Sequence, residues 1–203
     1  MKNKLKNFSS IILRPSLNKI HRFKDAHKGE SCYIFGDGVS IKWFDLANFS
    51  DKISIPVSFI PFHNDFGKLQ SKYFVLSQPY WFYPYQKTTV PPCFWWRNRI
   101  QREYRDIINS SRDKEFFINL SNKPVLSKKN VTFFFQKIHD SRLPDNFISN
   151  RINPFQGSVR ASLTLASYLG FSHAYLVGFD YTHNPARSLH WYEKGEGTVT
   201  PHI

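Results

Sequence analysis

The stretch that most constrains how this chain can fold is residues 153–181, where a loop, a helix and a strand are predicted in succession. Gly157 suits a tight turn, and Ser158 stands where a helix N-cap is expected. Apolar residues follow at helical spacing, and a glycine ends the helix before a short apolar strand at residues 174–177, which a glycine and Asp180 follow. This is half of a nucleotide-binding α/β unit, in which ligands bind at the carboxyl ends of the strands. The alternative is an ordinary helix and strand whose glycines only make turns.

The composition predicts one folded domain with an anionic partner. The chain has 203 residues, of which 41% are hydrophobic, and can bury a sizeable core. Its net charge of +13 favours nucleic acid, an anionic membrane surface or a phosphorylated substrate; a basic surface that only aids solubility is the alternative. Two cysteines are too few for a disulfide framework, and no apolar run approaches the roughly 18 residues that cross a bilayer. We therefore expect a cytoplasmic protein without a signal peptide.

A second glycine-containing motif follows the first predicted strand, residues 32–35. Gly36-Asp37-Gly38 can turn sharply and let the backbone approach a ligand closely. Ser40 is expected to cap a helix over residues 41–46, whose amino end would face an anion. The motif lacks the third glycine of the dinucleotide fingerprint, and no Walker lysine follows, which disfavours dinucleotide oxidoreductases and P-loop enzymes.

Further predicted strands end in polar residues that would share one edge of the sheet. Residues 55–60 lead to Asn64, which is expected to hydrogen-bond a ribose or base, with a solvated turn as the alternative. Residues 73–76 lead to Gln78. Residues 116–120 and 131–135 are also strand candidates. The predicted fold is α/β: a Rossmann-like, mostly parallel sheet with helices on both faces, formed by residues 31–203 after a basic lead-in, residues 1–30, on the surface or at a membrane interface.

The most aromatic stretch is residues 79–96, in which three prolines interrupt any regular helix. Arginines follow at positions 97, 99, 102 and 105. Aromatic rings beside arginines can stack the bases of single-stranded nucleic acid, or sugar rings. Because no nucleic-acid motif accompanies them, we expect a lid or an acceptor-binding region.

His190 is the candidate general base, because a histidine titrates near neutral pH and this one follows a polar, proline-containing loop. The alternative is a structural histidine. The eight histidines show no metal-ligand spacing, and there is no cysteine pair. We therefore predict that no metal is bound tightly.

Taken together, these segments resemble the small bacterial single-domain sialyltransferases and the wider group of MptE-like pterin pyrophosphokinases and motility accessory glycosyltransferases. The sequence IFGDGVSI is similar to that group's G-N-G-P-S-L signature, and QGSVRASLTLASYLGFSHAYLVGFDY is similar to its second signature. Gln78-Pro79 lies where the group has Asn-Pro or Asp-Pro, and His190 with Tyr192 lies where the sialyltransferases carry their base. The similar segments follow in the same order over residues 31–195.

The resemblance implies a glycosyltransferase whose donor is CMP-sialic acid or another nucleotide sugar. His190 would deprotonate the acceptor hydroxyl, and no metal or other cofactor would be needed. The substrate-binding residues that it implies are Gly36, Asp37, Gly38, Ser40, Asn64, Gln78, Gly157, Ser158, Asp180, Tyr181 and Tyr192. Among them, Gly157 and Ser158 would bind the sugar-phosphate at the helix amino end, and Asp180 and Tyr181 would close the far side of the site.

Three positions depart from the group's pattern. Asp37 replaces the usual Asn, so its carboxylate must bond a hydroxyl or a base unless the donor differs. Val39 replaces a proline. Thr182 stands where the sialyltransferases carry a phosphate-binding tyrosine, a role that Tyr181 or Tyr192 would have to take. The chain also ends soon after His190, where members of the group continue, so we expect a C-terminally truncated domain.

We therefore expect a bacterial glycosyltransferase of surface-polysaccharide biosynthesis, acting on a glycan or lipid-linked acceptor at the cytoplasmic face of the membrane. Peripheral contact of the protein with an anionic membrane is a further alternative, and no specific nucleic-acid partner is expected. The alternatives are a pterin-type pyrophosphokinase relative that uses ATP and magnesium, a basic nucleic-acid-binding module, and a non-catalytic relative that still binds nucleotide.

Overall fold

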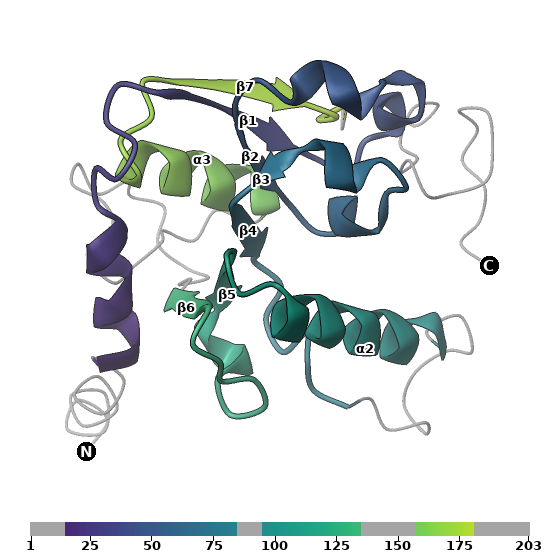
Figure 1. Cartoon of the computed structure of the whole chain (residues 1–203). Helices are drawn as coiled ribbons and strands as arrows, with labels where there is room; N and C mark the ends of the chain where they lie inside the picture. The colour runs from purple at the N-terminus through teal and green to yellow at the C-terminus, as the bar shows by residue number, and fades with distance from the viewer. Residues whose placement is uncertain (1–14, 85–94, 135–156, 181–203) are drawn as a thin grey trace.

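The computed structural model describes residues 15–84, 95–134 and 157–180, which form a parallel α/β fold (Figure 1). The strands are β1 (Ser31–Phe35), β2 (Ile53–Pro56), β3 (Gln70–Ser71), β4 (Tyr73–Leu76), β5 (Glu115–Asn119), β6 (Val131–Phe134) and β7 (His173–Val177). The α-helices are α2 (Trp95–Ser110) and α3 (Ser158–Tyr168). Short 3₁₀ helices are η1 (Lys19–Phe23), η2 (Val39–Trp43), η3 (Leu46–Phe49), η4 (Ile60–Phe62), η5 (Phe66–Lys68) and η7 (Leu120–Asn122).

All the strand pairs are parallel, which confirms the predicted fold class. One sheet has the order β3-β2-β1-β7, and the other has the order β4-β5-β6. A parallel bridge between Val57 and Val75 joins the end of β2 to β4. Through this bridge the strands follow one another as β7-β1-β2-β4-β5-β6, from top to bottom of Figure 1. The arrangement is Rossmann-like.

Both faces of the strands are covered by apolar side chains from other elements. On one face, Leu165 of α3 and its C-cap residue Leu169 pack with Ile34, Ile55 and Val75. On the other face, α2 packs against β4, β5 and β6, and the 3₁₀ helices that follow β1 and β2 pack against the remaining strands. Figure 1 shows α3 and α2 on opposite sides of the strands. The prediction of helices on both faces is therefore confirmed.

The order of the strands creates a switch point between β1 and β7. From β1 the chain proceeds strand by strand to β6, and then returns to pair β7 with the other side of β1. Crossovers between parallel strands are right-handed. The connection from β6 back to β7 runs across the sheet in the opposite direction to the earlier connections, so its helix, α3, lies on the opposite face of the sheet from α2. In such sheets the loops at the carboxyl ends of the two strands diverge, and ligands bind between them.

The boundaries of several predicted elements need correction. The predicted strand 73–76 is confirmed as β4, but the strand predicted at residues 55–60 is β2, Ile53–Pro56, because Ser58 has a left-handed backbone (φ +48°). The helix predicted at residues 41–46 is wrong. Phe44 and Asp45 are extended there, and the Asp45 side chain accepts the Ala47 N–H to begin η3.

The two predicted N-caps are also wrong. The N-cap of α3 is Gly157 (φ +115°), and Ser158 is the first residue of the helix. The N-cap of η2 is Gly38, without a side-chain hydrogen bond. The Ser40 hydroxyl donates instead to Asp180, which lies 140 residues away in the sequence. The Ser40 side chain, which the local sequence pattern predicts to be a helix cap, therefore bonds a residue distant in the sequence.

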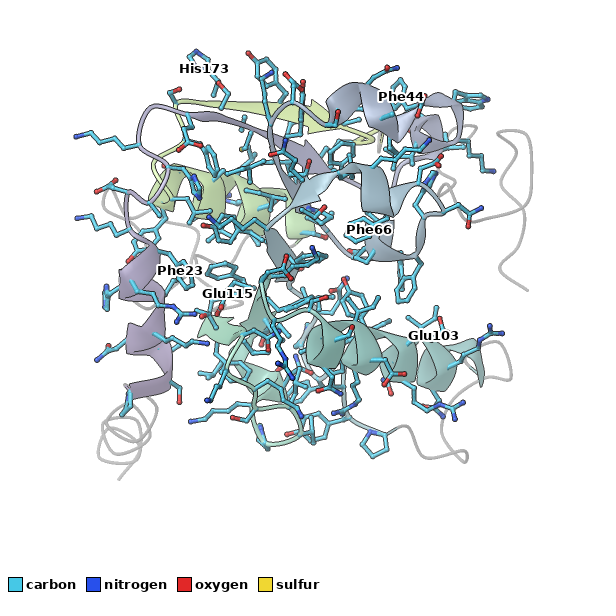
Figure 2. The ribbon with its side chains drawn as sticks, viewed as in Figure 1. Phe23, Phe44, Phe66, Glu103, Glu115 and His173 are labelled. Carbon is cyan, nitrogen blue, oxygen red and sulfur yellow. The ribbon has the colours of Figure 1, made fainter. Side chains whose placement is uncertain are left out.

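The described part of the basic lead-in packs against the sheet. Ile20 is buried beside β5 and β6, and Lys19 and Arg22 form ion pairs with the buried Glu115 at 3.1 Å and 2.7 Å. Figure 2 shows Glu115 beside the segment that carries Phe23. Burial lowers the pKa of Lys19, although hydrogen bonding and attraction to Glu115 act in the opposite direction. From residue 15 onward, the lead-in is thus part of the folded domain.

Candidate functional site

The carboxyl ends of β1, β2, β4 and β7 and the amino end of α3 carry most of the predicted site residues. Those within the described residues are Gly36, Asp37, Gly38, Ser40, Asn64, Gln78, Gly157, Ser158 and Asp180. Tyr181, His190 and Tyr192 lie outside the described residues. Four of these residues fall into two groups, one on each side of the loop that follows β1: Ser40 with Asp180, and Gln78 with Ser158.

The glycines of the first motif bring the loop after β1 against the loop after β7. The N–H of Gly36 donates to the Val177 carbonyl at 2.8 Å, and the N–H of Gly38 donates to the Gly178 carbonyl at 2.7 Å. A Cβ atom on either Gly36 or Gly38 would lie 2.6 Å from the Gly178 oxygen. The close backbone approach that the motif predicts is therefore made here to the protein's own chain.

The first group is the pair formed by Ser40 and Asp180. The N–H of Ser40 donates to Oδ2 of Asp180 at 2.6 Å, and the Ser40 hydroxyl donates to Oδ1. These bonds fix a carboxylate at the carboxyl end of β7, at the switch point. A carboxylate in this position suits hydrogen bonds from ribose hydroxyls.

A pocket of about 500 Å³ opens beside this pair. Its lining residues are Ser40, Phe44, Phe49, Leu176, Val177, Gly178, Phe179 and Asp180. This volume lies within the usual range for small-molecule sites, which combine apolar walls with a few polar groups. Sequence reasoning placed Ser40 and Asp180 here but missed the three phenylalanines. Phe44 and Phe179 lie close in the sequence to Gly38 and Gly178, and this proximity was the available signal.

The second group, which we call the polar cluster, consists of Ser58, Gln78 and Ser158. These residues come from the ends of β2 and β4 and the start of α3. The Ser58 hydroxyl lies 3.4 Å from the Ser158 hydroxyl. Nε2 of Gln78 donates to the Ser58 hydroxyl at 3.3 Å. Among the described residues, Oε1 of Gln78 is buried without a hydrogen-bond partner. The structure thus brings together two predicted residues and adds Ser58, which the sequence analysis did not single out.

Asp37 is buried (6% exposed), and its carboxylate accepts the Phe59 N–H at 3.1 Å and 3.3 Å. The sequence analysis expected this carboxylate to bond a ligand hydroxyl or base. The hydrogen bond from the Phe59 N–H stabilises the charged carboxylate in the interior, and the contact of Asp37 with a ligand stays a prediction.

Asn64 is exposed in the turn between η4 and η5, and within the described ranges no hydrogen bond joins it to either group. Its neighbour His63 accepts the Asp65 N–H at Nδ1, and burial lowers the pKa of His63. Both residues therefore belong to the turn, and the predicted ribose or base contact of Asn64 stays a prediction.

The aromatic stretch has a structural role in its described part. Trp81 and Phe82 are buried in the core beside Tyr104 and Ile108 of α2. Arg105, one of the arginines that follow the aromatic stretch, donates to the carbonyls of Val125 and Phe82. Trp81 and Phe82 are thus core residues, which corrects the expectation for these two. Residues 85–94 lie outside the described residues, and a lid role there stays a prediction.

Within residues 15–84, 95–134 and 157–180, no three histidine, cysteine or acidic side chains are grouped so that they could hold a metal ion. No helix in those ranges has the length and apolar character needed to cross a membrane.

No protein-family model matches the chain, and no similar curated protein or solved structure was found.

Proposed function

We propose that this protein is a glycosyltransferase, similar to the sialyltransferases, that moves a sugar from a nucleotide-activated donor to a surface-glycan acceptor. The observation that carries the proposal is the pocket beside Ser40 and Asp180 at the carboxyl ends of β1 and β7. Open parallel sheets bind ligands at this switch point. The net charge of +13 favours an anionic ligand such as a nucleotide.

The pocket suits the nucleoside part of such a donor. Phe44, Phe49 and Phe179 supply flat apolar walls on which a base can stack. Asp180 supplies two acceptor oxygens for ribose hydroxyls. We place the phosphate on the other side of the loop after β1, because the polar cluster and the first N–H groups of α3 offer several hydrogen-bond donors there.

The proposed reaction is a displacement at the anomeric carbon of the donor sugar. A base removes the proton from the acceptor hydroxyl, whose oxygen forms the new bond while the bond to the phosphate oxygen breaks. The departing nucleotide takes that electron pair, and hydrogen-bond donors stabilise its charge. In this proposal His190 is the base, and Tyr181 and Tyr192 assist the leaving group, as the resemblance implies. No metal takes part, and the acceptor is a glycan or a lipid-linked precursor.

Replacing Phe44 with alanine tests whether the pocket binds the base. Phe44 lines the pocket and is 41% exposed, so its loss should weaken nucleotide binding and leave the core intact. Stacking on an aromatic ring contributes about 1–3 kcal/mol per base, so we expect the Kd to rise roughly 5- to 150-fold. Isothermal titration calorimetry with the best-binding nucleotide measures this change.

The neighbouring Trp43 provides a matched control. It is 71% exposed and does not line the pocket, so Trp43→Ala removes an exposed aromatic ring from the position next to Phe44. The expected Kd of this variant equals that of the wild type. Equal affinities of all three proteins would place the nucleotide elsewhere and contradict the proposed pocket.

A further inference from the structure

We propose that Ser58 is a phosphate-binding residue of this site and that Asp37 and Tyr104 are positioning residues that hold it in place. This inference rests on the proposed function, because it assigns the part of the nucleotide that the polar cluster binds. Ser58 lies between β2 and η4 and is only 6% exposed, below the half-buried Gln78 and Ser158.

The peptide group between Ser58 and Phe59 is held at both of its polar atoms. Its carbonyl accepts the Tyr104 hydroxyl at 2.7 Å, and its N–H donates to the Asp37 carboxylate at 3.1 Å. Tyr104 is completely buried, and burial holds the pKa of its phenol well above the usual value. The phenol therefore keeps its proton and donates. Together the two hydrogen bonds fix the orientation of this peptide in the interior.

The orientation places Ser58 in a left-handed conformation, with φ at +48°. A side chain is strained there, whereas glycine adopts the same conformation without a steric penalty. At this position the side chain adds one chemical group to the turn, the hydroxyl. Strained residues of this kind cluster at functional sites, where the surrounding structure maintains them.

The hydroxyl of Ser58 has weak partners within the protein. Its distances of 3.4 Å to the Ser158 oxygen and 3.3 Å to Nε2 of Gln78 exceed the usual range of about 2.5–3.2 Å for such bonds. The three side chains come from separate elements and carry no charge. Serine hydroxyls and an amide group can donate several hydrogen bonds to the oxygens of one phosphate. We therefore assign the polar cluster to a phosphate of the nucleotide, with Ser58 at its base.

The Ser58→Gly variant separates binding from folding. Glycine relieves the backbone strain, so we expect a Tm equal to or above that of the wild type. Loss of a hydrogen bond to a charged phosphate should raise the Kd for a nucleoside monophosphate about 10-fold or more. The Kd for the matching nucleoside should not change. Calorimetric titration with cytidine monophosphate and with cytidine measures both values. The same comparison is then made with the monophosphate and the nucleoside of each other base.

Asp25→Gly is the matched control, since Asp25 is also left-handed (φ +57°) and exposed, and lies before β1 at the opposite ends of the strands. This variant should show the gain in Tm with unchanged affinities. Tyr104→Phe should weaken monophosphate binding in the wild type but not in Ser58→Gly. The reason is that Tyr104 acts on the phosphate only by positioning the Ser58 hydroxyl, which Ser58→Gly lacks. An equal loss in both backgrounds would overturn the positioning role.

The results also separate this inference from the proposed function. If the wild type binds a monophosphate and Ser58→Gly binds it equally well, the role of Ser58 is wrong while the proposed function stands. If Ser58→Gly weakens nucleoside and monophosphate equally, the phosphate assignment is wrong. If the wild type binds no nucleotide at all, the proposed function fails and the role of Ser58 fails with it.

Discussion

Replacing Gly178 with alanine is expected to destabilise the fold by about 2–5 kcal/mol. Gly178 follows β7 with φ at +72°, a conformation that strains any residue with a Cβ atom. That atom would also lie 2.5 Å from Cγ1 of Ile41 and 2.8 Å from the Gly36 carbonyl oxygen. Because Ile41 is fully buried and Gly36 is held to Val177 by its N–H, neither can withdraw easily. The loops after β1 and β7 would have to separate.

Urea unfolding followed by circular dichroism measures this loss, and Gly29→Ala is its matched control. Gly29 is also left-handed, with φ at +86°, but nothing lies within 4 Å of its added Cβ. Gly29→Ala should therefore lose only the conformational part, about 1–2 kcal/mol. Equal losses in the two variants would show that the close contact between the two loops does not contribute to stability.

Glu115→Ala is expected to destabilise the fold by about 2–4 kcal/mol. The buried carboxylate of Glu115 accepts hydrogen bonds from Lys19, Arg22 and the completely buried hydroxyl of Thr132. Its removal leaves the hydroxyl without this acceptor and two cations without their counterion. Because the side chains of Lys19 and Arg22 are 25% and 51% exposed, water can solvate them, which keeps the loss below that of a fully buried pair.

Asp113→Ala tests whether this effect depends on burial. The side chain of Asp113 is 80% exposed and pairs with Lys114 at 3.5 Å, so its removal should change the free energy of unfolding by less than about 1 kcal/mol. The same urea unfolding experiment serves both variants. A loss for Glu115→Ala as small as that for Asp113→Ala would mean that the lead-in is not anchored through this carboxylate.

The sequence predicts most of the strands because they are short apolar runs between turn residues, which parallel sheets favour. The polar, two-residue strand β3 contains no such run and is not predicted. Nor does the sequence predict how the loops at the strand ends use their polar side chains. Ser40 has the local signature of a helix cap, yet its hydroxyl bonds Asp180. Likewise, Trp81 looks like a ligand platform in the sequence but packs in the core, while Phe44 lines the pocket.

The conformation of Ser58 shows most clearly why local sequence patterns cannot predict part of the candidate site. Serine has no preference for a left-handed backbone, so the residue type gives no signal. The conformation depends on Asp37 from the end of β1 and Tyr104 from α2, which are 21 and 46 residues away in the sequence. Such contacts arise only after the strands and helices have packed. The glycines of the motifs do give a signal in the residue type, because only a residue without a Cβ atom allows the close approach of the loops after β1 and β7.

The most direct test of the central claim is a thermal-shift titration of the wild-type chain with nucleotides and nucleotide sugars, with and without magnesium. At a ligand concentration 100 times the Kd, binding contributes about 2.7 kcal/mol, which raises the Tm by about 5–10 °C for a domain of this size. We expect such a shift with CMP or a CMP-sugar and no requirement for magnesium. A shift with ATP and magnesium alone would favour a pyrophosphokinase, and no shift with any nucleotide would contradict the proposed glycosyltransferase.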